Sequence, residues 1–395
     1  MSATADSPEA VSILVPTYNR AGYLVACLDA LLPQVEPGDE VLVINDGSSD
    51  DTLERLSAYG DRIRVMTLTN GGKAAALNRG LAETDRPLVW IVDDDDLVRA
   101  DARARLVGAL AAHPDAGFAY GRHARFEDDP RTGARTWQDT GYWCHCAPDA
   151  FLVHTMEDLF AHHPGMIVRR WAYDLAGPFD PDLNRSEDYE MLIRLAITAR
   201  PVEVEGVIFD QRVHTGDRGS GKARVKASER DLNWIAHDRE IFRRFRDRLP
   251  LEMYLTERRI DGPESVRRAL VQRAVIHGRR HMWAEAADDF EAALEACASP
   301  LDDATRAIAR RATFSKYGCG SLLADRAVQA RLSALAQQGR AGADLLAAIA
   351  RGLNWRVRTA LQRGALAEGG SIMGLGLRWQ ASAHLAAFGR SARPS

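Results

Sequence analysis

The spacing of hydrophobic and polar positions divides the chain into two parts. Between residues 11 and 120, short apolar runs alternate with stretches in which apolar residues recur every three or four positions. Unbroken apolar runs are typical of strands buried on both faces, and the longer spacing is typical of amphipathic helices. This alternation predicts parallel βαβ units, and therefore an α/β fold with a doubly wound, mostly parallel sheet. The predicted strands are VSILVP (11–16), EVLVIN (40–45), RIRVMTL (62–68) and PLVWIV (87–92).

Beyond about residue 225 the pattern becomes helical throughout, which predicts an all-α C-terminal domain. Residues 262–300 resemble one helix pair of a tetratricopeptide array, and a small helical bundle is an equal alternative. The predicted organisation is a disordered N-terminus (1–10), an α/β domain (11–225) with halves at about 11–115 and 116–225, and a helical domain (226–395).

Polar side chains follow each of the four predicted strands. Because the carboxyl ends of parallel strands meet at one edge of a sheet, where ligands of such sheets bind, we expect these side chains to converge. They are Thr17, Tyr18 and Asn19 after the first strand, Asp46 after the second, Asn70 after the third, and Asp93 to Asp96 after the fourth.

The four consecutive aspartates 93–96 have two interpretations. A run of like charges is ordinarily a solvated loop. Clustered carboxylates with no basic residue between them also suit a hard divalent cation, and Mg²⁺ usually completes its shell with phosphate oxygens. The convergence of other polar strand ends favours a cation shared with a nucleoside diphosphate.

Six segments together resemble glycosyltransferases of family 2, which have the GT-A fold. These are SILVPTYNR, VINDGSSDDT, NGGKAAALNRGL, IVDDDD, the segment 166–196 that contains RSEDYEMLIRLA, and DQRVHTGDRGS at 210–220. The resemblance covers roughly residues 11–220. It implies an inverting enzyme that moves a sugar from a nucleotide diphosphate sugar, with UDP-sugar as the favoured donor, to a glycan, lipid-linked or small-molecule acceptor.

The resemblance also implies roles for particular residues. Asp188 would be the catalytic base, and Glu187 beside it would lie on the acceptor side. Asp95 and His214 would hold Mg²⁺ or Mn²⁺. The residues implied to bind the nucleotide sugar are Pro16, Thr17, Tyr18, Asn19, Asp46, Lys73, Asn78, Asp93 and Asp94.

Three of these residues also have a structural interpretation. Asp46 opens DGSSDD, a good helix-capping sequence, and Asp188 lies where acids commonly begin a helix. A single histidine such as His214 is usually structural. Leu77 in AALN departs from many non-processive members of the family, but the Gln-x-x-Arg-Trp element and the membrane helices of processive synthases are absent. We therefore expect a non-processive enzyme.

Charge and composition limit the partners. A net charge of −4 provides no overall basic field for nucleic acid. The first ten residues lack the features of a signal peptide, and no apolar run is long enough to span a membrane, which predicts a cytoplasmic protein. Residues 351–395 hold seven arginines and one acid among apolar side chains. This segment is either a solvated helical face or a peripheral contact with the inner face of a membrane or with a protein.

Two alternatives belong to other functional classes. A sugar nucleotidyltransferase also uses a doubly wound sheet, but it requires a Gly-rich basic loop after the first strand, where this chain has PTYNRAG. A non-catalytic nucleotide-binding or helical interaction protein is the alternative from another class. A helical interaction protein would have no use for the acidic cluster, so metal-dependent nucleotide binding distinguishes it from a transferase.

Overall fold

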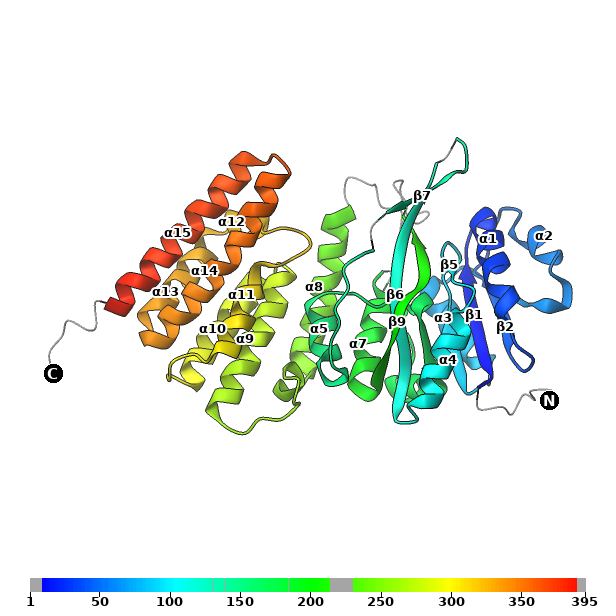
Figure 1. The fold of residues 1–395 in the computed structure, drawn as a ribbon, viewed down its shortest axis with the longest axis horizontal. Coiled ribbons are helices and arrows are strands. Elements are labelled where there is room, and N and C mark those ends of the chain that lie inside the picture. The colour runs from blue at the N-terminus through cyan, green and yellow to red at the C-terminus, as the bar shows by residue number, and fades with distance from the viewer. Residues whose placement is uncertain (1–8, 130, 139, 184, 214–229, 389–395) are drawn as a thin grey trace. The chain divides into compact units, whose positions relative to one another are not determined.

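The computed structural model describes residues 9–129, 131–138, 140–183, 185–213 and 230–388, arranged in two compact units (Figure 1). The N-terminal unit comprises the residues up to 155 together with 159–230, and the helical unit comprises 156–158 together with the residues from 231 onward. The predicted domain boundary at 225/226 lies outside the described residues.

The N-terminal unit is built on one sheet of nine strands within the described residues. They are β1 (Val11–Thr17), β2 (Glu40–Asn45), β3 (Arg64–Thr67), β4 (Leu88–Ile91), β5 (Leu97–Val98), β6 (Ala116–Asp128), β7 (Arg135–Gln138), β8 (Met166–Arg169) and β9 (Arg200–Arg212). The strand order is β3-β2-β1-β4-β8-β6-β9-β5, and β7 pairs with β6. The pairings of β3 through β4 are parallel, whereas β8 pairs antiparallel with both of its neighbours. The predicted α/β class with a mostly parallel sheet is confirmed.

Seven helices accompany the sheet in the described residues. They are α1 (Ala21–Leu31), α2 (Thr52–Ser57), α3 (Lys73–Ala82), α4 (Ala102–Ala112), α5 (Phe151–Glu157), α6 (Arg170–Ala176) and α7 (Glu187–Thr198). They cover both faces of the first strands. On one face, Ile13 lies in a core cluster with Leu28 of α1 and Leu106 of α4. On the other face, Leu14 approaches Gly80 of α3. This two-sided burial explains why β1, β2 and β4 have no polar alternation. The prediction that residues 62–68 form a buried strand is wrong in its burial, because β3 lies at the edge of the sheet and is largely exposed.

The helical unit confirms the predicted all-α region. Its helices are α8 (Arg230–Arg248), α9 (Pro263–Arg279), α10 (Trp283–Ala296), α11 (Asp303–Arg310), α12 (Gly320–Ala324), α13 (Arg326–Ala334), α14 (Gly339–Gln362) and α15 (Leu366–Phe388). One core cluster runs through it, from Leu270 of α9 to Trp379 of α15. None of the helices in the described ranges has the length and apolarity needed to cross a bilayer.

Two loops at the end of the sheet approach each other so closely that one position must be glycine. Gly47, just after β2, has a φ of +78°, which side chains of L-residues rarely adopt. A Cβ atom there would lie 3.0 Å from the backbone nitrogen of Asn70 and 3.1 Å from the carbonyl oxygen of Leu68. The loop after β2 and the loop before α3 are therefore packed backbone against backbone.

We expect Gly47→Ala to lower the free energy of unfolding by about 2–3 kcal/mol, because positive φ and backbone crowding both oppose the new methyl group. Gly60→Ala is the matched control, since Gly60 also has a positive φ of +54° but a Cβ atom added there would meet no other atom within 4 Å. It should lose only the conformational part, about 1 kcal/mol. Urea unfolding of both variants measures the difference, and equal losses would contradict the packing argument.

Candidate functional site

The four aspartates 93–96 after β4 alternate between partly buried and buried positions. Asp94 and Asp96 are buried, whereas the other two are only partly buried. The Oγ1 of Thr17 donates a hydrogen bond to Asp94 at 2.7 Å, and the backbone nitrogen of Arg212 donates to Asp96 at 2.9 Å. Two of the four carboxylates thus attach the loop to β1 and β9, and the other two remain at the sheet edge.

Two cations compensate this loop, and they come from other strand ends. The Nη1 of Arg20 lies 3.0 Å from Asp94 Oδ1 and 2.8 Å from Asp95 Oδ2. The Nζ of Lys73 lies 2.6 Å from Asp93 Oδ1. The sequence places no basic residue within the acidic run, but the fold brings Arg20 from the end of β1 and Lys73 from the start of α3. The run is therefore not a solvated loop of unpaired charges.

Burial changes the protonation of the inward-facing acids. It raises the pKa of Asp94 to about 6, with a further contribution from the charge of Asp95, although Arg20 and Thr17 act in the opposite direction. Burial, together with the charges of its neighbours, also raises the pKa of Asp96 well above its ordinary value. Repulsion between adjacent carboxylates is thus reduced within the loop.

Asp46, at the end of β2, holds the loop before α3. Its two carboxylate oxygens accept hydrogen bonds from the backbone nitrogens of Gly71 and Gly72, each at 2.9 Å, and the side-chain amide of Asn70 donates to Oδ2 at 3.1 Å. The acid that accepts from the start of α2 is instead Asp50, which lies 3.2 Å from the nitrogen of Thr52. Asp46 therefore positions the backbone of NGGK rather than capping α2.

The segment after β1 is tied to the same edge. Pro16 and Thr17 are buried, Tyr18 is partly buried, and Asn19 is exposed with a φ of +53°. The Oδ1 of Asn19 accepts a hydrogen bond from the nitrogen of Ser49 at 2.7 Å. The ends of β1 and β2 are thereby joined beside the acid loop, where the four predicted residues of PTYN lie.

The side chain of Asn78 connects α3 by hydrogen bonds to the loop before α7. Its Nδ2 donates to the carbonyl oxygen of Phe179 at 2.8 Å, and its Oδ1 accepts from the nitrogen of Phe179 at 2.7 Å. Both ends of the amide are thus bonded to one backbone residue. Asn78, which the resemblance places beside the nucleoside, positions the segment that leads to Glu187 and Asp188.

The two acids at the start of α7 differ in burial and in protonation. Glu187 is buried, and this burial together with the charge of Asp188 raises its pKa to about 7, against the opposing charge of Lys73. Asp188 is only partly buried. Burial by itself would raise the pKa of Asp188, but nearby positive charge, that of Lys73 first, outweighs it and lowers the pKa below its ordinary value. Asp188 is therefore the ionised and more accessible acid of the pair.

Lys73 links the two groups of acids. Burial opposes its charge, but Asp93, Glu187 and Asp188 together raise its pKa well above the ordinary value. His163 is also buried near this group, and burial lowers its pKa to about 4, so the imidazole is neutral at pH 7. The principal cation that acts on Asp188 at neutral pH is therefore Lys73.

The proposed metal ligands can be tested only in part, because His214 lies outside the described residues. In the part of the chain that the structure describes, no three His, Cys, Asp or Glu side chains form a metal cage. Asp93 and Asp95 nevertheless present partly exposed carboxylates at one edge. Mg²⁺ is commonly held by one or two carboxylates and by phosphate oxygens, so this donor set fits a cation that is shared with a nucleotide.

Residues 12–170, which carry this edge of the sheet, match the sequence model described as glycosyl transferase family 2. Residues 12–170 therefore form a domain of this family.

Relatives in the family cover different shares of the chain. Chondroitin synthase of Pasteurella multocida is 28% identical over 215 residues, which are 54% of this chain but only 21% of the synthase. A PGL/p-HBAD biosynthesis glycosyltransferase of Mycobacterium bovis is 26% identical over 286 residues, 68% of this chain and 97% of that protein. The crystal structure of S. aureus TarS 1-349 is similar with a TM-score of 0.48 and 17% identity, over 79% of this chain and 87% of that one.

Three residues near this edge of the sheet were not predicted as part of the site. Arg20 binds two of the aspartates, and His163 is buried beside Lys73 and Asp188. Arg212 donates from Nε to the carbonyl oxygen of Asp95 at 2.8 Å. Arg20 ends the segment SILVPTYNR and Arg212 lies in the segment DQRVHTGDRGS, so both positions could have been found from the sequence. His163 carried no such signal.

The opposite pKa shifts predict opposite effects on stability. The folded pKa of Glu187, about 7, exceeds the value of about 4.3 for an unfolded glutamate, so its contribution to stability falls as pH rises through this window. Glu187→Gln should therefore raise the free energy of unfolding above pH 7, by at most about 3 kcal/mol, and should have little effect near pH 4.5.

Asp188→Asn is the matched variant with the opposite sign. Because the folded pKa of Asp188 is lowered, its ionised form stabilises the fold above the unfolded pKa of about 4, and the variant should lose stability at neutral pH. Thermal unfolding of both variants between pH 4.5 and 8 measures these differences. A stabilised Asp188→Asn together with a destabilised Glu187→Gln would reverse the assignment.

Proposed function

We propose that this protein transfers a sugar from a nucleotide diphosphate sugar to an acceptor hydroxyl, with inversion at the anomeric carbon and Asp188 as the general base. The observation that carries the proposal is that the two adjacent acids at the start of α7, Glu187 and Asp188, differ in burial and in pKa. Of two adjacent carboxyl groups, the more accessible one has a lowered pKa and the buried one a raised pKa. Environments that shift the pKa values of neighbouring acids in opposite directions are typical of acid–base sites.

The reaction is a single displacement. The acceptor oxygen forms its bond to the anomeric carbon as the bond to the nucleoside diphosphate breaks, and the acceptor proton passes to the carboxylate of Asp188. A single displacement with one base inverts the anomeric centre. Glu187, with a pKa near 7, retains a proton for much of the time at neutral pH and so places little additional charge beside the base.

The donor would bind across the ends of β1, β2 and β4. Pro16 to Asn19 and Asp46 border the proposed nucleoside pocket, and Lys73 contributes the positive charge nearest the acids. Asp95 and His214 would hold Mg²⁺ or Mn²⁺, and Asp93 and Asp94 would bind the nucleotide sugar beside the metal. The bound cation would stabilise the negative charge of the leaving diphosphate. UDP-sugar is the proposed donor class.

The acceptor and the location of the enzyme are also proposals. We assign the acceptor to glycans, lipid-linked sugars or small molecules, because the named activities of relatives include polysaccharide synthesis and PGL/p-HBAD biosynthesis. The acceptor half contains the β6–β7 hairpin, on which Trp137 is 52% exposed. A cytoplasmic location is supported by five cysteines that are all free thiols, as is usual in a reducing compartment.

Asp188→Asn separates binding from chemistry. The variant keeps the shape of the side chain but cannot accept the proton, so turnover should fall by about 10²–10⁴ while donor affinity is preserved. Initial rates and donor binding are measured on the same preparation. Glu187→Gln is the matched control and should lose less activity. If Glu187→Gln is inactive and Asp188→Asn remains active, the base is Glu187.

Asp95→Ala tests the metal. The partly exposed side chain contributes little packing, so the variant should remain folded while the Mn²⁺-dependent part of nucleotide affinity is lost. Thermal shifts with UDP-, GDP- and dTDP-sugars, with and without Mn²⁺, report both the donor and the metal effect. Asp101→Ala removes an exposed acid at the start of α4 and should leave these shifts unchanged. An equal Mn²⁺ effect in Asp95→Ala and the wild type would exclude Asp95 as a metal ligand.

A further inference from the structure

The last helix of the helical unit is apolar on two opposite faces. On one face of α15, Ile372, Leu375 and Trp379 are buried in the core cluster. On the opposite face, Leu366, Met373 and Leu377 are 69%, 52% and 59% exposed. Spacings of seven and four residues bring these three side chains onto one stripe of the helix. Trp379 therefore packs in the core, but the exposed stripe has no packing partner in the described part of the helical unit.

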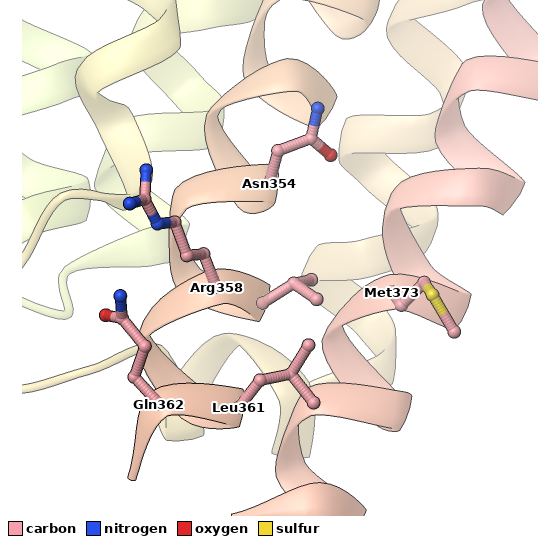
Figure 2. Close-up of a pocket in the computed structure, with 6 residues that line it drawn as sticks. Asn354, Arg358, Leu361, Gln362 and Met373 are labelled. Atoms are coloured by element: carbon pink, nitrogen blue, oxygen red, sulfur yellow. The ribbon is translucent and has the colours of Figure 1, made fainter.

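The exposed stripe continues into a groove on α14. Val357 and Leu361 of α14 and Met373 of α15 line this groove, whose volume is about 380 Å³. Figure 2 shows Leu361 and Met373 on facing sides of the space between the two helices, with Arg358 and Gln362 directed away along α14. Leu361 is 51% exposed, so the apolar surface extends over both helices.

The charged residues around this surface are almost all cationic. Arg358, Arg363 and Arg378 are exposed, and within the described ranges they form no ion pair with a carboxylate. By contrast, Arg331 of α13 pairs with Asp288 at 2.8 Å and with Glu291 at 2.7 Å. The sequence from 351 to 395 contains seven arginines and only one acid, Glu368. Uncompensated positive charge thus surrounds exposed Leu and Met side chains.

We propose that this face of α14 and α15, defined by Leu361, Leu366, Met373 and Leu377 with Arg358, Arg363 and Arg378, binds the surface of a bilayer that contains anionic phospholipid. The apolar stripe would enter the boundary between headgroups and acyl chains, and the arginines would bind lipid phosphates. A second copy of the chain is a poorer occupant, because a symmetric contact would bring the arginines of both copies together. The proposal concerns a surface separate from the transferase site and does not depend on it.

Sedimentation of the full-length protein with lipid vesicles tests the proposal. The protein should bind vesicles of phosphatidylcholine mixed with phosphatidylglycerol, bind pure phosphatidylcholine weakly, and dissociate as salt is raised. The triple variant Leu366→Glu/Met373→Glu/Leu377→Glu should lose about 100-fold or more in vesicle affinity, because each glutamate removes apolar burial and adds repulsion. All three positions are exposed, so thermal unfolding should resemble that of the wild type.

Matched variants distinguish this face from unspecific adhesion. Leu232→Glu, at a 71% exposed leucine on α8, should bind the mixed vesicles as the wild type does. Replacing Arg358, Arg363 and Arg378 by Gln should weaken binding by roughly fivefold per arginine. Absence of vesicle binding by the wild type, or undiminished binding by the triple glutamate variant, overturns the proposal. Self-association of the wild type that the triple variant abolishes, without vesicle binding, would assign the face to a second copy and overturn it as well. Donor affinity should be the same in all variants.

Discussion

Charge compensation across strand ends is the constraint on which the N-terminal unit depends. Four successive carboxylates follow a buried strand, and burying such groups without partners costs several kcal/mol each. Arg20 and Lys73 supply the partners, and Thr17 and the backbone of Arg212 supply hydrogen bonds. These groups belong to β1, the start of α1, α3 and β9. The contacts that offset the cost of burying the acid loop therefore also hold these elements together at the edge of the sheet.

Lys73 connects this loop with the start of α7. It pairs with Asp93, and its charge also acts on Glu187 and Asp188, so the acid loop and the start of α7 share one cation. The result is an ionised Asp188 beside a Glu187 that is held near half-protonation at neutral pH. A buried acid with a raised pKa reduces stability at neutral pH, a cost that is typical of functional sites.

Within the described residues, charged side chains of the helical unit form ion pairs in its interior but not around the exposed face of α14 and α15. In its interior, Asp289 accepts from Arg246 at 2.5 Å and from Arg273 at 2.7 Å, and this shared carboxylate joins α8, α9 and α10. Around the exposed face of α14 and α15, by contrast, arginines have no carboxylate partner in the described ranges. Paired charges organise the first half of the unit, and unpaired charges beside apolar side chains leave the second half suited to an external partner of opposite charge.

The sequence alone determined the local elements and the edge at which polar groups gather. Strands buried on both faces must be apolar without alternation, so β1, β2 and β4 were predicted close to their observed bounds, whereas β3 is an edge strand and largely exposed. Parallel strands necessarily bring Thr17, Asp46 and the aspartates to one edge. Only the tertiary structure decided which groups pair there. Arg20 reaches Asp94 across 74 positions, and Asn78 binds Phe179 across 101. Contacts over such distances in the chain produce no periodic pattern in the sequence. The difference in pKa between Glu187 and Asp188 depends on burial and on the charge of Lys73, and neither can be inferred from the local sequence.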